Sequence, residues 1–218
     1  MNPSPTEENY LKAIYHLSQD PREKISLTAI AELLKVNAAS AVEMIKKLTE
    51  RKLISYDKSR GVKFTEKGGR IALSIVRSHR LWEVFLLKKL GYSWDAVHEI
   101  AEQLEHVKHP ELADRLDGFL GYPEYDPHGD PIPKSNGQLP HTFRTSLSEI
   151  EPGRACQIVG VKDTSPSYLQ YLQQLHISIG TRVKVVERIA FDGSFIIQVG
   201  KSNKTTVSKL FAESVLVT

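Results

Sequence analysis

Residues 26–65 read SLTAIAELLKVNAASAVEMIKKLTERKLISYDKSRGVKFT and decide the fold of the first part of the chain. Ser26 and Asn37 are residue types that cap helix N-termini, and an apolar periodic run follows each of them. We therefore predict two helices joined by a short turn. Two β-prone runs then flank the polar turn at 57–61, which predicts a hairpin.

A further amphipathic helix is predicted upstream, at 6–18, with Thr6 as its N-cap. In the third helix, Val42, Ile45 and Leu48 recur at helical spacing and are expected to point inward. Three helices followed by a hairpin is the order of a winged helix-turn-helix, whose third helix enters the major groove of DNA while the hairpin lies on the backbone. The alternative is a small helical domain with no nucleic-acid role.

The net charge of +3 conceals an uneven distribution of charged residues along the chain. Residues 44–70 hold 9 Lys and Arg against 3 Asp and Glu, which favours a polyanionic partner for the third helix and the hairpin. Residues 71–142 hold 7 basic against 11 acidic residues and six of the eight histidines, which fits a cation site. The same charge distribution would also be expected of surface residues that contact only water.

The remainder of the chain changes from helical to β character. Residues 66–90 predict one long apolar helix, and its surplus of apolar side chains suggests a dimer interface. Two shorter helices are predicted at 93–105 and 110–120, and the Pro- and Gly-rich stretch 121–141 predicts no regular element. A small all-β barrel or sandwich with one short helix near 167–175 follows, with strands expected in RACQIVGVK, TRVKVVERIA, SFIIQVG, KTTVSKL and SVLVT.

The fold class is therefore mixed α and β with several domains. We expect a winged helix-turn-helix in residues 1–70, a helical dimerisation and metal-binding domain in 71–142 and an all-β domain in 143–218. The chain has no run of about 18 apolar residues and begins without a signal-peptide pattern, so we expect a cytoplasmic protein with no membrane partner. The single cysteine, Cys156, excludes intrachain disulfides and cysteine-rich zinc sites.

Two predicted helices carry groups of metal-ligand residues. A helix turns about 100° per residue, so offsets of four, seven and eight lie within one arc of about 100°. Imidazole and carboxylate without thiolate suit Mn2+, Fe2+, Co2+ or Zn2+, and the surplus of oxygen favours Mn2+. The alternative is a polar helix face that contacts only water. That alternative would account for a single His–Glu pair, but it accounts less well for ligand-type residues on two helices. The groups are His79 and Glu83 on the first helix, and His98, Glu102, Glu105 and His106 on the second.

Enzymatic readings find little support in the sequence. Zinc hydrolases often carry two histidines four residues apart with a glutamate beside the first, and neither helix has that arrangement. Nucleophile-elbow, phosphate-loop and dinucleotide motifs are also absent from the sequence. We expect no enzyme. The alternatives are a metal-dependent hydrolase with an appended β domain and a non-DNA interaction protein that uses the β domain.

Several motifs in order resemble one family. They are ENYLKAIYHL, IAELLKVNAASAVEMIKKL, SRGVKFTEKG, RSHRLWEVFL, VHEIAEQLEHV and DPHGDPIP. The chain resembles the diphtheria-toxin-repressor and manganese-transport-regulator family of bacterial metal-dependent repressors over nearly its whole length. The resemblance implies an SH3-like (FeoA-type) β-barrel at the C-terminus and a homodimer on a palindromic double-stranded operator of metal-homeostasis genes. It also implies Mn2+ as the activating ion, with Fe2+ as the alternative and Zn2+ or Co2+ as substitutes in vitro.

The same resemblance implies three sets of metal ligands. The primary site matches Asn9, Glu102, Glu105 and His106. The ancillary site matches His79, Glu83 and His98, and a loop site matches Asp126, His128 and Asp163. The resemblance implies that metal, held by Asn9 and the other primary ligands, fixes the winged domain and so sets the spacing of the two recognition helices.

Three positions bear on the type of metal. Iron-type members have Cys where this chain has Glu102, which makes the centre manganese-like. Manganese members usually have Asp where Asn9 stands, and an amide oxygen is a neutral ligand. Lys12 occupies a position that is Glu in short manganese regulators, and a protonated lysine cannot ligate a metal.

Ten residues of the third helix and the hairpin are expected at the DNA. The N-terminal group would approach base edges, where Ala methyls can contact thymine and Ser or Glu can hydrogen-bond. The basic group would contact phosphates. The first group is Asn37, Ala38, Ala39, Ser40 and Glu43, and the second is Lys46, Lys47, Lys58, Arg60 and Lys63.

Overall fold

The computed structural model describes residues 2–20, 24–140, 143–200 and 204–218. Its chain divides into two compact units. The first unit comprises Met1–His79, Glu102–Phe119 and Pro133–Leu139, and the second comprises Arg80–Ala101, Leu120–Ile132 and Pro140–Thr218. The predicted domain boundaries at residues 70 and 142 stay predictions.

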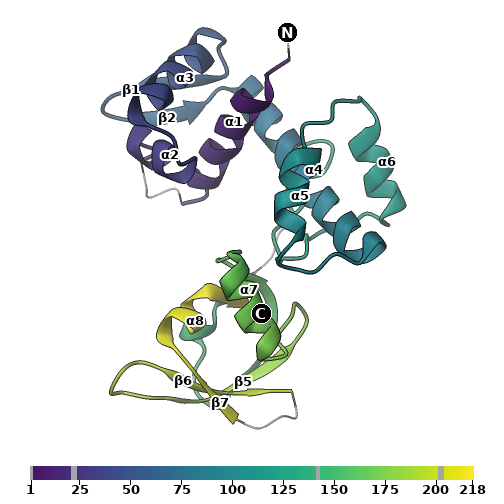
Figure 1. The fold of residues 1–218 in the computed structure, drawn as a ribbon. Coiled ribbons are helices and arrows are strands. Elements are labelled where there is room, and N and C mark those ends of the chain that lie inside the picture. The colour runs from purple at the N-terminus through teal and green to yellow at the C-terminus, as the bar shows by residue number, and fades with distance from the viewer. Residues whose placement is uncertain (1, 21–23, 141–142, 201–203) are drawn as a thin grey trace. The chain divides into compact units, whose positions relative to one another are not determined.

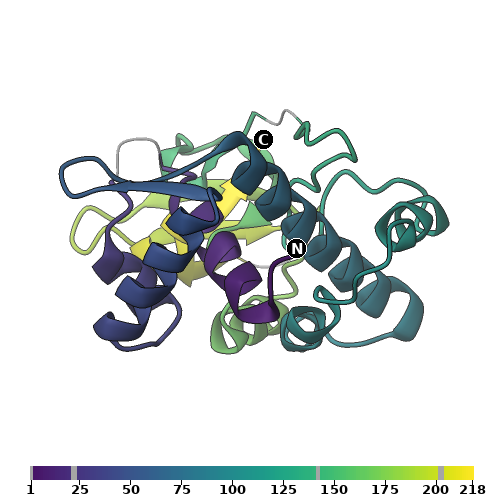
Figure 2. The same ribbon diagram turned by 90° about the horizontal axis from the view of Figure 1, so that it is seen from above.

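The first unit begins with three helices and a hairpin, in the predicted order (Figure 1). Figures 1 and 2 show the hairpin beside the third helix. The elements are α1 (Pro5–Leu17), α2 (Leu27–Leu33), α3 (Ala38–Glu50), β1 (Ile54–Asp57) and β2 (Gly61–Phe64).

The helix caps explain where these elements begin. The Ser26 side chain accepts a hydrogen bond from Ala29 N at 3.0 Å, and Asn37 Oδ1 accepts one from Ser40 N at 2.8 Å, which confirms both predicted caps. The prediction of Thr6 as a cap is wrong, because α1 starts at Pro5. Ser4 caps it in a capping box with Glu7, and Pro5 suits the first turn because its missing N–H needs no partner there.

The hydrophobic core of the first unit lies between α1, α2, α3 and the start of α4 (Glu66–Leu90). Ile45 and Leu48 are buried as predicted, but Val42 is 49% exposed, so its predicted inward position is wrong. Ala41 is buried instead of Val42. At about 100° per residue, Ala41, Ile45 and Leu48 lie within a narrower arc of the helix than Val42, Ile45 and Leu48 do.

Helix α4 has the predicted bounds, and the next two helices are shorter than predicted. α5 covers Val97–Leu104 rather than 93–105, because Gly91 at φ +70° and a turn at 94–96 precede it. α6 covers Leu112–Phe119. Along α4, Ile75, Leu81 and Val84 are buried within the single chain, so their apolar character by itself does not require a dimer interface.

The C-terminal part of the second unit is a six-stranded antiparallel sheet in the order β3-β8-β4-β5-β6-β7. Because β3 and β7 are its edges, the sheet is open rather than the expected closed barrel. The strands are β3 (Thr145–Ser146), β4 (Ala155–Val161), β5 (Arg182–Arg188), β6 (Phe195–Val199), β7 (Lys204–Val207) and β8 (Val215–Val217). The helical pieces are η1 (Leu147–Glu149), α7 (Pro166–Gln174) and α8 (Lys209–Ser214).

In the second unit, one predicted strand is shorter than expected, and the core of the sheet includes a residue from the helical segment. The strand expected over KTTVSKL ends at Val207, because Ser208 accepts a hydrogen bond from Phe211 N and caps α8. Trp94, which precedes α5, is buried in the same hydrophobic core as Ile158, Val185 and Phe195 of the sheet. A residue of the helical segment therefore belongs to the core of the β domain.

The contact between α1 and α3 gives a first testable prediction. Glu7 is 2% exposed and accepts a hydrogen bond from Arg51 Nη1 at 2.6 Å. Burial opposes its ionisation, but the hydrogen bonds from Arg51 and Ser4 outweigh burial and lower the pKa of Glu7 from 4.5 to about 2. We expect Glu7→Gln to lower the free energy of unfolding by about 1–3 kcal/mol at neutral pH.

This loss should depend on pH. Because the folded pKa lies below the unfolded one, the stabilisation is complete above the ordinary pKa of 4.5 and disappears as the pH falls toward about 2. Urea unfolding of both proteins across this range measures the difference. Glu50→Gln, an exposed change on α3, is the control. A pH-independent difference would contradict the assignment.

Candidate metal centre

The end of α5 and the residues after it carry a buried polar cluster in the first unit. Glu102 is the last predicted ligand within α5, whereas Glu105 and His106 follow its final residue, Leu104. Glu105 Oε2 lies 2.6 Å from Nδ1 of His79 on α4. His79, Glu102 and Glu105 offer ligand atoms that all lie within 4.8 Å of one another. The structure thus brings His79 to two of the predicted primary ligands.

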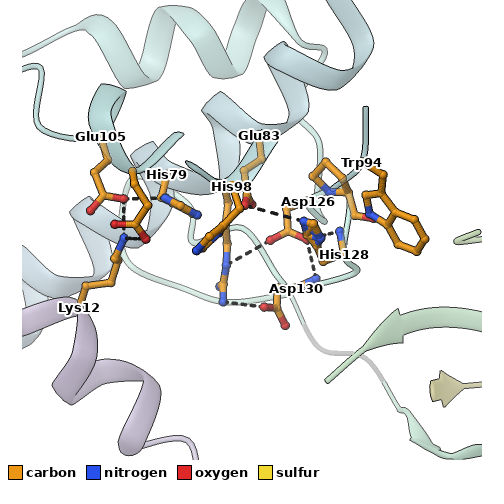
Figure 3. A network of polar contacts seen from close by, with 12 residues as sticks. Lys12, His79, Glu83, Trp94, His98, Glu105, Asp126, His128 and Asp130 are labelled. Atoms are coloured by element: carbon orange, nitrogen blue, oxygen red, sulfur yellow. Dashed lines mark hydrogen bonds and ion pairs between the residues drawn. The ribbon is translucent and has the colours of Figure 1, made fainter. Parts of the chain in front are cut away.

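Helix α1 contributes a lysine to this cluster. The ammonium of Lys12 donates to Glu102 Oε1 at 2.6 Å and to Glu105 Oε2 at 2.7 Å, as Figure 3 shows for Lys12 and Glu105. The Lys12 side chain is 9% exposed and that of Glu105 is 0% exposed. A buried ammonium therefore already neutralises part of the carboxylate charge.

Glu8 also belongs to the cluster, although sequence reasoning did not select it. Its Oε2 lies 2.7 Å from His106 Nδ1, and its Oε1 lies 2.6 Å from Lys108 Nζ. The side chain is 5% exposed. Glu8 precedes Lys12 by four residues, so the two share a face of α1, and that helical spacing was the available signal.

Two buried acceptor atoms, one on α1 and one just after α5, are compatible with a bound cation. Asn9 Oδ1 and Glu105 Oε1 are buried and have no hydrogen-bond partner among the described residues. Glu105 Oε1 lies 3.8 Å from His106 Nε2. Buried oxygens without a donor are costly, and a divalent ion would satisfy them. The donor set of carboxylate, amide oxygen and imidazole fits a hard or borderline ion such as Mn2+ or Fe2+.

The second unit holds another predicted group. Glu83 is 2% exposed and its Oε1 lies 3.1 Å from His98 Nδ1 and 3.9 Å from His128 Nε2. The His128 ring stacks on Trp94 with centroids 5.9 Å apart, so the aromatic core holds it in place (Figure 3). On α4, His79 stands one turn before Glu83, as the helical spacing requires.

Asp126 anchors the loop that carries His128. Its Oδ1 accepts hydrogen bonds from His128 N at 2.8 Å and Asp130 N at 2.9 Å, and its Oδ2 lies 3.5 Å from Arg80 Nε. Burial, and then the charges of Glu83 and Asp130, raise the pKa of Asp126 well above its ordinary value against the opposing effect of Arg80.

Asp163, the third residue of the predicted loop site, has a different environment. It is exposed, and its Oδ1 accepts a hydrogen bond from Ser165 N at 2.8 Å in the turn before α7. Its role as a ligand stays a prediction.

The predicted DNA-contacting residues form one accessible set. All ten of them are exposed along α3 and the hairpin. Gly61 begins β2 at φ +77°, and an added Cβ would lie 2.5 Å from Ile25 O, so the hairpin turn needs glycine there. Val62 N donates to Ile25 O at 3.0 Å and ties the hairpin to the segment before α2.

Comparisons with known proteins agree with this architecture. Residues 4–62 match the family described as the iron dependent repressor N-terminal DNA binding domain. Residues 65–134 match the iron dependent repressor metal binding and dimerisation domain, and 145–218 match the FeoA domain. A manganese-dependent transcriptional repressor solved in complex with manganese is 36% identical with a TM-score of 0.87, and the match covers 97% of this chain and 98% of that one. The chain belongs to the diphtheria-toxin-repressor family of metal-dependent transcriptional repressors.

Other members of the repressor family are similar over different lengths. The solved manganese regulator SloR is 37% identical with a TM-score of 0.78, over 100% of this chain and 99% of that chain. The iron-dependent repressor IdeR of Mycobacterium tuberculosis (strain ATCC 25618 / H37Rv) is 32% identical over 128 residues, which is 59% of this chain and 55% of that protein. The diphtheria toxin repressor of Corynebacterium jeikeium (strain K411) is 30% identical over 128 residues, 59% of this chain and 53% of that protein. The match thus spans about half the length of these curated relatives.

Among the described residues, no helix is long and apolar enough to cross a membrane.

Glu105 supplies the second testable prediction. Replacing it by Ala removes a carboxylate that contacts both Lys12 and His79. We expect Glu105→Ala to weaken Mn2+ binding at this centre by at least about a hundredfold, because both of its buried acceptor oxygens are lost. Calorimetric titration of the metal-free protein measures the change. Glu99→Ala, an exposed change on α5, is the matched control, and an unchanged affinity in Glu105→Ala would place the ion elsewhere.

Proposed function

We propose that this family member is a Mn2+-dependent repressor that binds a palindromic operator as a homodimer and controls genes of metal homeostasis. The observation that carries the proposal is the polar cluster of Glu8, Lys12, His79, Glu102, Glu105 and His106. This cluster joins α1, the first helix of the DNA-binding fold, to α5 and the segment after it. Asn9, which follows Glu8 in α1 and has a buried Oδ1, is proposed as a further ligand.

The choice of Mn2+ rests on the donor atoms. Carboxylate or amide oxygen comes from Glu8, Asn9, Glu102 and Glu105, and imidazole nitrogen comes from His79 and His106, with neither Cys nor Met among them. Oxygen-rich sites suit Mn2+, whereas softer sulfur ligands select other ions. Fe2+ is the alternative because the curated relative IdeR is named an iron-dependent repressor, and Zn2+ or Co2+ would substitute in vitro.

Neighbouring residues of α1 connect the centre to the DNA-binding surface. Glu8 contacts His106, and Glu7 contacts Arg51, the C-cap residue of α3. A bound divalent ion would supply positive charge shared by α1 and the segment after α5. Any restraint on α1 then acts on α3 through the Glu7–Arg51 pair, which favours one orientation of the recognition helix.

The exposed surface of α3 and the hairpin supports the DNA-binding role. Ala38, Ala39 and Ser40 lie at the N-terminus of α3, where a recognition helix approaches base edges. The exposed lysines and arginine of α3 and the hairpin suit phosphate contacts. The matched relatives are named as repressors, so neither the hydrolase nor the non-DNA interaction protein is retained.

The third prediction tests metal-triggered DNA binding. We expect the purified protein to bind labelled DNA from its own upstream region with Mn2+, or with Fe2+ kept reduced, and to lose binding in chelator. Glu102→Ala should lose the metal response, because its carboxylate belongs to the cluster, while Glu99→Ala should keep it. Electrophoretic mobility shifts at fixed salt measure both. Equal binding in chelator and in metal would contradict the proposal.

A fourth prediction separates phosphate contacts from base contacts. Lys46→Ala should weaken binding to all DNA sequences and reduce the salt slope by about one. Ser40→Ala should change the preference at one base pair by about 1–3 kcal/mol and leave the salt slope unchanged. Fluorescence anisotropy over a salt series, with Lys209→Ala on α8 as the control, measures these effects. Identical behaviour of the Lys46 and Ser40 variants would contradict the assignment.

A further inference from the structure

The strongest unexplained feature of the metal centre is the buried ammonium of Lys12. It lies 2.6 Å from Glu102 Oε1 and 2.7 Å from Glu105 Oε2, the distances of short charge-assisted hydrogen bonds. Lys108 is also near the cluster, but its side chain is 38% exposed and it contacts Glu8. Lys12 is thus the more deeply buried of the two lysines, and it contacts both Glu102 and Glu105.

A cation between two carboxylates occupies the place that a bridging ion would take. A metal that used both Glu102 Oε1 and Glu105 Oε2 would meet the ammonium within a few ångströms. Like charges at such a separation repel strongly where water is largely excluded. Metal binding through these oxygens therefore requires Lys12 to leave them or to remain at an electrostatic cost.

The same lysine also holds the cluster together without metal. Two carboxylates that face each other, one buried and one partly exposed, repel, and the ammonium between them offsets that repulsion. Lys12 belongs to α1, Glu102 belongs to α5 and Glu105 follows α5. The ion pairs therefore also hold α1 against this segment in the metal-free protein.

We propose that Lys12 is an intramolecular competitor of the divalent ion, which sets the free metal concentration at which the centre fills. It is a built-in monovalent cation that holds the carboxylates until a divalent ion replaces it. This proposal rests on the proposed metal-dependent function and deepens it. The consequence is a lower metal affinity than the same ligands would have without Lys12.

The fifth prediction follows from removing this charge. In the full chain, Lys12→Met should bind Mn2+ at least about tenfold more tightly than the unchanged protein, because the repulsion is removed. Lys12→Arg keeps the positive charge, and with it the repulsion of the divalent ion, so its affinity should stay within about threefold of that of the unchanged protein. Lys67→Met removes the same net charge at an exposed position of α4 and should alter the affinity by less than about threefold. Mn2+ titration followed by the electron paramagnetic resonance of the free ion measures all four proteins.

Stability provides a second readout that keeps the test decisive. Without metal, Lys12→Met should melt at a lower temperature, because Glu102 and Glu105 lose their counter-ion. Saturating Mn2+ should raise its melting temperature by more than it raises that of the unchanged protein. If Lys12→Met does not fold in chelator, recovery of the folded circular dichroism signal with Mn2+ supports the proposal, and no recovery overturns it.

The outcomes distinguish this inference from the proposed function. An unchanged or weaker Mn2+ affinity in folded Lys12→Met overturns the role of Lys12 while leaving the repressor function intact. An equal gain in affinity in Lys67→Met also overturns it, because net charge rather than the bridging position would then be responsible. If the unchanged protein binds no Mn2+, or binds DNA equally in chelator, the proposed function itself is wrong.

Discussion

The ion pairs of Lys12 with Glu102 and Glu105 are the interaction on which the functional part of the first unit depends. Buried charges are tolerated only when they have close partners, and here three charged side chains lie within hydrogen-bond distance. The pairs join α1 to residues that follow it by 90 and 93 positions. This contact makes the start of the chain part of the candidate metal centre.

In the proposed function, α1 links metal binding to DNA binding through adjacent residues. Glu8 and Lys12 face the metal cluster, while Glu7 pairs with Arg51 at the end of the recognition helix. Because α1 is a single helix, a restraint on the face that carries Glu8 and Lys12 also restricts the position of Glu7. A metal-responsive repressor needs such a connection, because a ligand shifts a conformational equilibrium only through contacts that differ between the states.

Sequence reasoning succeeded where local physics decides the structure. The bounds of α4 and the caps Ser26 and Asn37 follow from apolar periodicity and from side chains that bond nearby backbone groups. It was wrong at Thr6, at Val42 and for the strand continued past Val207, because Ser4 caps α1, Ala41 is buried in place of Val42 and Ser208 caps α8. The open sheet also reflects long-range pairing, which alternation within single strands does not specify.

The sequence by itself determined the three-helix and hairpin order, the basic surface of α3 and the ligand-type residues His79, Glu83, His98 and Glu102 of α4 and α5, because helical spacing places side chains on common faces. Glu105 and His106, expected on the same helix face, follow the end of α5. The family resemblance added Asn9, which spacing alone did not select. Only the tertiary structure decided that Glu8 meets His106, that His79 meets Glu105 and that Lys12 lies between Glu102 and Glu105. These contacts join positions far apart in the chain, and which distant charges meet depends on how the helices pack, a property that no local pattern encodes.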